Sequence, residues 1–274
     1  MPFENSVAIV TGGASGIGRA LSLKLARRGA IVIIADIRLA PAQEVAASIV
    51  SFGGRASAAC ADVAQAPDVQ RLVDNAVGEH GRLDFMFNNA GIGVGGEVRD
   101  LSLDHWQKAI DVNLRGVVNG VVAAYAVMVR QRQGHIVNIA SLAGLIASPG
   151  LAPYAATKGA VVSLTSALRL EAEAYGVRAS VVCPGFIDTS IFENAIGVKL
   201  DKQKLLKQIR LPLLRAGDAA RAILRGVERN KSVIVFPRSA RLLWMASRIS
   251  PSLLMPLQRR MTAGLLALRQ GQLE

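Results

Sequence analysis

Tyr154 and Lys158 are the residues of this chain whose types and spacing most directly suggest acid–base chemistry. They lie four positions apart, so on a helix their side chains occupy one face. A phenol with the ordinary pKa of about 10 exchanges protons poorly near neutrality, and a nearby ammonium lowers that pKa by favouring the phenolate. The pair therefore predicts a tyrosine general acid or base. Ser141, thirteen residues before Tyr154, could hold a substrate oxygen and stabilise the charge that develops on it.

A glycine-rich turn lies near the start of the chain. It reads TGGASGIG over residues 11–18 and follows an apolar run at 6–11. Glycines permit a tight turn and a close approach of the backbone to a pyrophosphate, and the next helix offers unpaired N–H groups at its N-terminus. The turn therefore predicts a dinucleotide site. The residues expected to contact the cofactor there are Gly12, Ser15, Gly16, Ile17 and Gly18.

Asp36 lies eighteen residues beyond Gly18, at the end of the next apolar run. A carboxylate at that place accepts hydrogen bonds from the adenosine ribose hydroxyls and repels a 2′-phosphate, so it favours NAD over NADP. Arg38 follows two residues later and could meet a 2′-phosphate, which leaves NADP as the alternative cofactor.

The chain up to residue 236 alternates short apolar runs with longer amphipathic ones. Continuous β-branched runs are typical of strands that are buried on both faces of a parallel sheet. The predicted strands lie at 6–11, 30–35, 56–61, 83–88, 134–140, 177–182 and 232–236. The predicted helices lie at 16–28, 41–53, 67–80, 103–132, 153–175 and 218–229. This alternation predicts an α/β chain with a doubly wound parallel sheet, the Rossmann fold, in three αβα layers.

In their order and spacing, these motifs resemble those of the classical short-chain dehydrogenase/reductase family. The glycine turn has the family's Thr-Gly-x-x-x-Gly-x-Gly pattern, and Tyr154 with Lys158 reproduces Tyr-x-x-x-Lys. Further segments that match the family in order are Asp62-Val63, Asn88-Asn89-Ala90-Gly91, Asn113 within Asp-Val-Asn-Leu, and Pro184-Gly185-Phe186-Ile187-Asp188-Thr189. The resemblance covers residues 5–236, so we expect one catalytic domain over 1–236 and a basic amphipathic extension over 237–274.

The resemblance implies a catalytic set of Asn113, Ser141, Tyr154 and Lys158. In that set Lys158 would also bond the nicotinamide ribose, and Asn113 would hold a water that links Lys158 to solvent. The further cofactor contacts that the resemblance implies are Asp62, Val63, Asn89, Ala90, Gly91, Pro184, Gly185, Ile187 and Thr189, besides Tyr154 and Lys158. The expected activity is hydride transfer between NAD(H) and a secondary alcohol or ketone, because the cofactor carries the hydride chemistry. A homodimer or homotetramer is expected on the same ground.

The segment 190–215, where the family places its substrate-covering residues, is apolar. Its apolar members are Ile191, Phe192, Ile196, Val198, Leu200, Leu205 and Leu206. A cover of this kind predicts a hydrophobic substrate, such as a steroid, retinoid, fatty or aryl alcohol or ketone. Its lysines, which either guide an anionic substrate group or face solvent, are Lys199, Lys202, Lys204 and Lys207. Two alternative functions stay open: an NADP(H)-dependent 3-oxoacyl-thioester or carbonyl reductase, and a non-catalytic NAD-binding protein at a membrane.

The net charge of +12 is confined to the end of the chain. Residues 1–198 hold 16 basic and 16 acidic side chains, whereas residues 199–274 hold 16 basic and 4 acidic ones. A neutral body with a basic last quarter does not indicate a nucleic-acid-binding protein. Two apolar helical stripes in the extension consist of Leu242, Met245, Ala246 and Ile249, and of Leu257, Met261, Leu265 and Leu268.

Arginines flank these apolar stripes of the extension. Such a pattern suits a helix that lies on anionic lipid. It equally suits a helix that packs on its own body or on a sister subunit, and an acidic partner protein is a third alternative. No apolar run in the extension reaches the ~20 residues that a membrane span requires.

Cysteine and histidine usage points to neither a disulfide framework nor a metal site. The chain has two cysteines and three scattered histidines. The N-terminus shows no basic region followed by an apolar stretch, so we expect no secretory signal and a cytoplasmic location, with peripheral membrane contact as an option. His135, at the start of a predicted strand, is interpreted as a capping or surface residue, and Cys183 as a small buried hydrophobic residue.

Overall fold

A parallel sheet forms the centre of the computed structural model, which describes residues 3–189, 191, 195–199 and 213–267. The sheet is seven-stranded, with the order β11-β7-β6-β4-β1-β2-β3. Its strands are β1 (Val7–Thr11), β2 (Ile31–Asp36), β3 (Arg55–Cys60), β4 (Phe85–Asn88), β6 (Gly134–Ile139), β7 (Val177–Pro184) and β11 (Val233–Phe236). All seven predicted strands are confirmed, with ends that differ by at most two residues.

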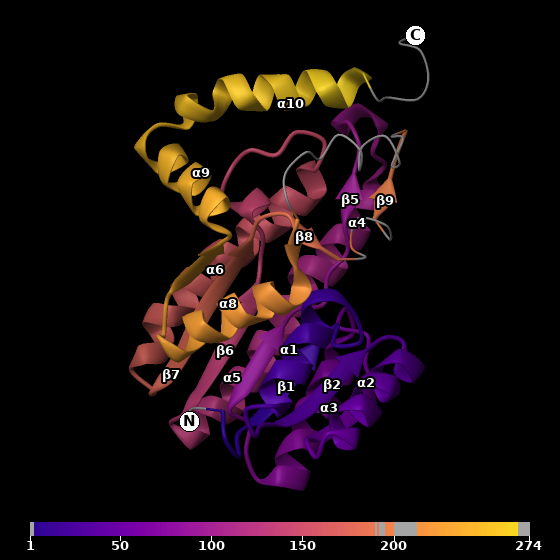
Figure 1. Ribbon diagram of the computed structural model, residues 1–274, viewed down its shortest axis with the longest axis vertical. Helices are drawn as coiled ribbons and strands as arrows, with labels where there is room; N and C mark the ends of the chain where they lie inside the picture. Colours follow the sequence, from indigo (N-terminus) through magenta and orange to yellow (C-terminus); the bar gives the residue numbers. More distant parts are fainter. Residues whose placement is uncertain (1–2, 190, 192–194, 200–212, 268–274) are drawn as a thin grey trace.

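Helices cover both faces of this sheet (Figure 1). The helices of the described residues up to β11 are α1 (Gly16–Ala26), α2 (Leu39–Ser51), α3 (Ala66–His80), α4 (Leu103–Ile110), α5 (Gly116–Gln131), α6 (Ala152–Glu173) and α8 (Ala216–Glu228). Cores of buried side chains lie on each face: one includes α1, α2 and α8, and the other includes α3, α5 and α6. The predicted doubly wound, three-layer Rossmann architecture is therefore confirmed.

The residues of β1 show why an unbroken apolar run forms a central strand. Ala8 and Val10 belong to the core beside α1, whereas Val7 and Ile9 belong to the opposite core. Because successive side chains point to opposite faces, both faces of a buried strand require apolar residues. In the sheet, β1 lies between β2 and β4 and pairs with both. The strand order reverses at this point, so the helices on its two sides cover opposite faces of the sheet. A crevice therefore opens beyond the carboxyl ends of these strands.

The predicted long helix over 103–132 is wrong in one respect. A π-helical turn, Asp111–Arg115, separates α4 from α5 and contains Asn113. Such turns occur as single interruptions inside α-helices, whereas the apolar pattern over 103–132 predicts one continuous helix. The combined segment Leu103–Gln131 is long and apolar enough to cross a membrane, but 50% of its most apolar stretch is buried inside the fold. Its place in the core accounts for that composition.

Two short strand pairs without a predicted counterpart lie beyond the main sheet in the described residues. Val94–Gly95 (β5) pairs with Ile196–Gly197 (β9), and Ile187–Asp188 (β8) pairs with Leu214–Arg215 (β10). Each of these four strands is only two residues long, which is too short for a period-two pattern to be recognised in a sequence.

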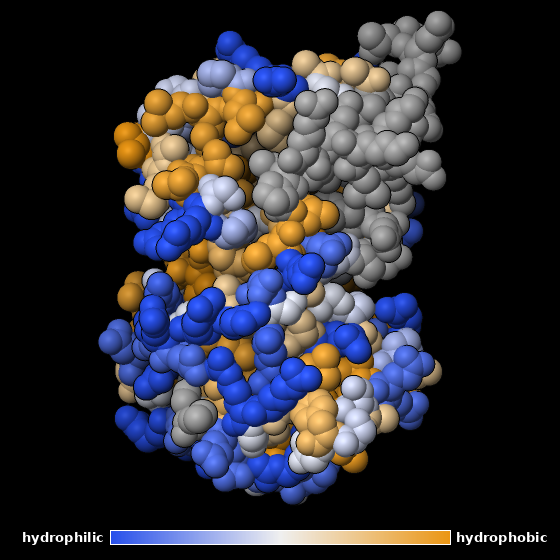
Figure 2. Space-filling model, viewed as in Figure 1, coloured by the Kyte–Doolittle hydropathy of each residue, from blue (hydrophilic) through white to orange (hydrophobic). Residues whose placement is uncertain are grey.

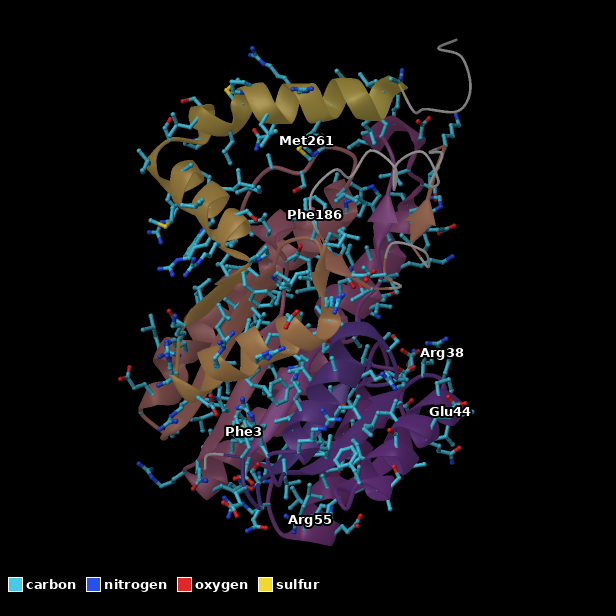
Figure 3. All side chains as sticks on the ribbon, in the orientation of Figure 1. Phe3, Arg38, Glu44, Arg55, Phe186 and Met261 are labelled. Carbon is cyan, nitrogen blue, oxygen red and sulfur yellow. The ribbon has the colours of Figure 1, made fainter. Side chains whose placement is uncertain are left out.

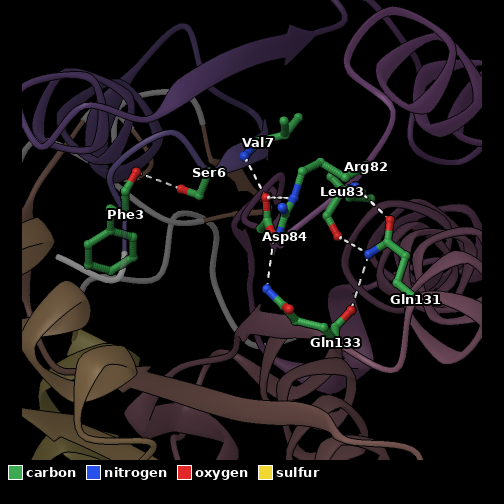
Figure 4. Close-up of polar contacts among 8 residues, drawn as sticks. All are labelled: Phe3, Ser6, Val7, Arg82, Leu83, Asp84, Gln131 and Gln133. Atoms are coloured by element: carbon green, nitrogen blue, oxygen red, sulfur yellow. Dashed lines mark hydrogen bonds and ion pairs between the residues drawn. The ribbon is translucent and has the colours of Figure 1, made fainter.

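A buried carboxylate organises the opposite edge of the sheet, where the strands begin (Figure 4). Asp84 accepts hydrogen bonds from the N–H of Val7 and from the guanidinium of Arg82. Gln131, at the end of α5, accepts from the N–H of Leu83 and donates to its carbonyl, at 2.9 and 2.8 Å. These bonds connect β1, β4 and α5 at the edge that lies away from the glycine turn.

His135 is buried rather than superficial, so its interpretation as a capping or surface residue is wrong. Only 3% of it is exposed, and its Nε2 lies 2.8 Å from Ser180 Oγ. The Ser180 hydroxyl donates to the carbonyl of Lys231, so the imidazole joins β6 to β7. Burial lowers the pKa of His135 from 6.5 to about 3, and the charges of Arg178 and Arg169 add to this lowering.

Two helices follow β11 at the top of the molecule in Figure 1: α9 (Arg238–Ile249) and α10 (Met255–Ala267), joined by the 3-10 turn Pro251–Leu254. The side-chain amide of Gln258 donates to the carbonyl of Ala147, at 3.2 Å. Leu265 lies so close to Gly150 that a Cβ there would approach its Cδ2 to 2.6 Å. Thus α10 rests on the loop before α6. The predicted stripe residue Leu268 lies outside the described residues.

We predict that His135 makes the fold sensitive to acid. Its folded pKa is about 3 and its ordinary value is 6.5. The unfolded chain therefore binds the proton more readily, and stability is lost as pH falls from 6.5 towards 3, by up to roughly 1.4 kcal/mol per pH unit. In urea unfolding, His135→Gln should show a smaller loss between pH 6.5 and about 5 than the unsubstituted chain. His80→Gln is the control and should keep the original slope; equal slopes for all three proteins would contradict the prediction.

Candidate active site

The glycine turn after β1 lies directly against the end of β4. Gly12 has φ +61°, and a Cβ on it would lie 2.8 Å from the Cα of Ala90. Gly18, in the first turn of α1, lies against the carbonyl of Gly12 so closely that a Cβ there would collide with it. Only glycine at these positions lets the turn, α1 and β4 meet, and the N-terminus of α1 then points its free N–H groups at the crevice.

Thr11 and Asn89 hold this contact in place. The hydroxyl oxygen of Thr11 accepts hydrogen bonds from the N–H groups of Asn89 and Ala90, at 3.0 and 3.1 Å. The side-chain amide of Asn89 donates to the carbonyls of Thr11 and Gly12, at 2.9 and 3.2 Å. The side chain of Asn89 thus supports the glycine turn. Thr11 was not among the predicted site residues, although the Thr that begins the family's glycine pattern was a signal for it.

The loop that follows β7 reaches the same turn. A Cβ on Gly16 would lie 3.2 Å from the Cγ2 of Thr189, so these residues are in contact across the crevice. The N–H of Gly185 donates to the carbonyl of Phe236, which ties Pro184 and Gly185 to β11. Ile187 is buried in β8. The structure therefore brings Thr189, at the end of this loop, to Gly16 at the N-terminus of α1, whereas Pro184 and Gly185 lie beside β11.

Asp36 ends β2 beside the glycine turn. Its carboxylate is buried and accepts hydrogen bonds from the N–H groups of Ala14 and Arg38, at 3.2 and 3.1 Å. Arg38 is mostly exposed, and its Nε lies 3.9 Å from Asp36 Oδ1. In Figure 3 Arg38 lies at the outer side of α2. The Asp36 carboxylate is thus held by the backbone of the glycine turn, whereas the Arg38 guanidinium lies at the surface.

The predicted adenine-contacting pair, Asp62 and Val63, follows β3. The Asp62 carboxylate accepts from the N–H of Ala64 at 3.0 Å, which forms a local turn. Val63 is buried, and a Cβ on Gly116 would approach its Cγ2 to 2.7 Å. This loop therefore packs against the start of α5, next to the crevice.

Tyr154 and Lys158 lie in the first two turns of α6, as their spacing predicts. Lys158 is only 2% exposed, and its Nζ donates to the carbonyl of Ile139 at 2.8 Å. The same Nζ lies 5.7 Å from the centroid of the Tyr154 ring. Ser141 precedes the 3-10 turn Leu142–Gly144 after β6, and its side chain is close enough to the Tyr154 hydroxyl to affect the pKa of that group. The three predicted side chains are therefore gathered at one point.

The pKa of Tyr154 is shifted upward, whereas the sequence predicts a downward shift. Burial raises the pKa of Tyr154, and the hydrogen bond with Ser141 lowers it in part. Burial also lowers the pKa of Lys158 to about 8. The pKa of Tyr154 is therefore not lowered as predicted: burial is the largest influence on the phenol, and the Lys158 ammonium is not among the groups that shift it. Cys183 is a buried neighbour of both groups, and burial raises the pKa of its thiol to about 12.

Asn113 is buried in the π-helical turn, and its amide bonds the backbone of one residue on the opposite loop. Its Oδ1 accepts from the N–H of Ile92 at 2.8 Å, and its Nδ2 donates to the carbonyl of Ile92 at 2.9 Å. A Cβ on Gly91 would lie 3.0 Å from Asn113 Oδ1 and 3.3 Å from Lys158 Nζ. Gly91 thus leaves room for both side chains. The Asn113 amide positions the loop after β4.

Glycine also allows the serine loop to reach α6. A Cβ on Gly144 would lie 2.6 Å from the carbonyl carbon of Lys158. The 3-10 turn therefore packs directly on the helix backbone, which places Ser141 beside Tyr154. Gly144 was not among the predicted site residues, because a lone glycine in a loop carries no specific signal.

Much of the predicted substrate cover lies outside the described residues, namely Phe192, Leu200, Leu205, Leu206, Lys202, Lys204 and Lys207. The described part is half-buried at Ile191, Ile196 and Val198. Lys199 pairs with Asp100 at 3.1 Å. Among the described residues, no group of three or more His, Cys, Asp or Glu side chains could hold a metal ion.

Comparisons with known proteins agree with this geometry. Residues 6–197 match the short chain dehydrogenase family. A cyclohexanol dehydrogenase of Acinetobacter sp. is 41% identical over 202 residues, which cover 72% of this chain and 80% of that protein. A 3-oxoacyl-(acyl-carrier-protein) reductase of Synechocystis sp. is 38% identical over 213 residues, with coverages of 77% and 83%.

A solved structure resembles almost the whole chain. The crystal structure of a short-chain dehydrogenase/reductase from Burkholderia phymatum in complex with NAD superposes with a TM-score of 0.84. It is 29% identical, and the match covers 94% of this chain and 96% of that one. The chain therefore belongs to the short-chain dehydrogenase family, whose oxidoreductases act on CH–OH or carbonyl groups with NAD(P).

Proposed function

We propose that this protein interconverts a secondary alcohol and a ketone with NAD(H), and that its substrate is hydrophobic. The observation that carries this proposal is the meeting of Ser141, Tyr154 and Lys158 beside the loop after β4, which contacts the glycine turn. The catalytic residues that we propose are Asn113, Ser141, Tyr154 and Lys158.

The raised pKa of Tyr154 determines how it would act. At neutral pH its hydroxyl keeps its proton, so it is ready to donate that proton to a carbonyl oxygen. Ser141 would bond the same oxygen and stabilise its developing charge. When bound, the nicotinamide supplies the hydride chemistry. In alcohol oxidation Tyr154 must accept a proton instead, which requires a higher pH or a further stabilisation of the phenolate by the Lys158 ammonium.

The residues around the glycine turn fit a dinucleotide. Gly12 and Gly18 provide the close approach, Ser15, Gly16 and Ile17 begin the helix, and Asp36 is the acceptor for ribose hydroxyls. We propose NAD rather than NADP, since the buried Asp36 carboxylate would repel a 2′-phosphate. The exposed Arg38 beside it keeps NADP(H)-dependent reduction of a 3-oxoacyl thioester as the second candidate, and the Synechocystis relative is named a 3-oxoacyl-(acyl-carrier-protein) reductase.

The hydrophobic substrate is supported by the surroundings of the site. Ile191, Ile196 and Val198 are apolar and half-buried in the segment beyond β8, and Leu265 of α10 rests on Gly150 in the loop before α6. The name of the Acinetobacter relative, cyclohexanol dehydrogenase, also fits a small apolar alcohol. We further propose a homodimer or homotetramer in the cytoplasm, as is usual in this family.

We predict that Tyr154→Phe lowers kcat by roughly a hundredfold to ten-thousandfold, because general acid–base catalysis is lost. The substitution removes one oxygen atom from a ring that stays packed, so NADH binding should be unchanged by fluorescence titration. Tyr175→Phe is the matched control, since Tyr175 lies half-exposed beyond the end of α6. Unchanged turnover in Tyr154→Phe would reject the proposed role and favour a non-catalytic NAD-binding protein.

We predict that Asp36→Asn weakens NADH binding by about tenfold, because a charge-assisted hydrogen bond becomes a neutral one. NADPH binding should stay the same or improve, since the carboxylate no longer repels the 2′-phosphate. Fluorescence titration with both cofactors measures the two affinities, and Asp74→Asn, an exposed change on α3, is the control. Tighter binding of NADPH than of NADH by the unsubstituted protein would contradict the NAD assignment.

We predict that kcat/KM rises across a series of secondary alcohols of increasing length, by up to roughly threefold to fourfold for each methylene that the pocket buries. The measurement is NADH formation at fixed NAD. Polyols of similar size serve as the comparison, and a preference for them would rule out the hydrophobic substrate class.

A further inference from the structure

The outer side of α9 presents apolar side chains to solvent. We define the α9 face as Leu242, Met245, Ile249 and Leu253, which lie on α9 and the turn after it. Leu242 is 66% exposed and Ile249 is 82% exposed. The opposite side of α9 packs inward through the buried Ala240, so the predicted stripe does not cover its own body. Figure 2 shows hydrophobic residues gathered at the upper left, over α9 and the turn that follows it.

Basic residues accompany this face without any acidic counterpart. Between Glu228 and Glu274 the sequence contains eight arginines and lysines and no aspartate or glutamate. Those on α9 are Arg238, Arg241 and Arg248. The guanidinium of Arg248 lies 5.7 Å from the centroid of Trp244, and all three arginines are exposed. The α9 face is therefore an apolar stripe with a positive border.

The positive surface continues into a groove between α8, β11 and α9. Its basic lining residues are Arg225, Arg229, Lys231 and Arg241. All four are exposed, and the neighbouring Glu228 is paired with Arg28 at 2.6 Å. The groove thus adds cations along α8 and β11, and Arg241 joins it to α9.

We propose that the α9 face binds the protein peripherally to the surface of an anionic lipid bilayer. The apolar side chains would enter the boundary between headgroups and acyl chains, and the arginines would contact the lipid phosphates, as in interfacial amphipathic helices. The turn after α9 lies at an outer corner of the molecule in Figure 1, where a flat surface can reach it. This inference goes beyond the proposed function and does not depend on it.

The charge of the face argues against a second copy of this chain as its occupant. In a two-fold contact the same patch meets itself, so the arginines of α9 would face one another without a carboxylate between them. A lipid surface supplies the missing negative charge and an apolar layer together. It also accepts a convex corner, which needs no matching groove.

The test is sedimentation of the full-length protein with lipid vesicles. We expect binding to vesicles of phosphatidylcholine mixed with phosphatidylglycerol, and little binding to phosphatidylcholine alone. Raising the salt from about 0.1 M to about 1 M shortens the Debye length from ~10 to ~3 Å and should release most of the protein. Arg241→Gln with Arg248→Gln should reduce binding by roughly tenfold or more, since each removed charge near the surface weakens it severalfold.

A second variant tests the apolar side chains. Leu242→Ser with Ile249→Ser should also reduce binding by roughly tenfold or more, because both side chains are exposed and would enter the lipid. The matched controls change similar side chains elsewhere on the surface: Val50→Ser, and Lys108→Gln with Arg130→Gln. Thermal unfolding of each variant verifies that it is folded.

The possible results distinguish an anionic lipid surface from a second copy of the chain as the partner of the α9 face. Loss of anionic-vesicle binding in both α9 variants, with the controls unchanged, supports the proposal. Absence of binding at low salt overturns it, and so does binding that both α9 variants retain. A concentration-dependent dimer in light scattering that both α9 variants abolish would assign the face to a second copy instead. Salt-sensitive binding that only the arginine variant loses would indicate a purely electrostatic contact and reject insertion of the apolar side chains.

Discussion

The close contact between the glycine turn and the end of β4 is the constraint on which the rest of the site depends. At Gly12 and Gly18 there is no space for a Cβ, and Thr11 with Asn89 joins the two segments by hydrogen bonds. This contact sets the height of α1 above the sheet and thereby the place of its free N–H groups. It also lets Asp36 bond the turn through Ala14. The glycine turn, the Asp36 carboxylate and the loop after β4 thus form one assembly.

A buried cation organises the other half of the crevice. Lys158 has little contact with water, so its charge depends on the carbonyl of Ile139 and on the polar groups around it. The same desolvation that lowers the pKa of this lysine raises that of Tyr154. Backbone packing at Gly144 and Gly91 keeps the phenol, the ammonium and the Asn113 amide at these distances. The protein therefore provides a protonated phenol close to the serine hydroxyl.

The two ends of the molecule differ in how their charges are balanced. In the body, Asp84 is satisfied by Arg82 and the backbone of Val7, and His135 is held neutral by burial. Beyond β11 the basic side chains lack acidic residues in the sequence around them, and apolar residues of α9 face solvent. Such a surface has a large unfavourable apolar exposure unless something covers it. The body is thus self-contained, whereas α9 has the features of a contact surface.

Much of this architecture is determined by local sequence. Continuous apolar runs such as β1 can only be buried on both faces, and the spacing of Tyr154 and Lys158 places them on one side of a helix in any fold. The tertiary structure alone decided the π-helical turn at Asn113, the burial of His135 and the contacts of Gly144, because each depends on a neighbour distant in sequence. It also decided the direction of the Tyr154 pKa: a sequence shows which charge is near, but desolvation depends on how many atoms from other elements surround the group.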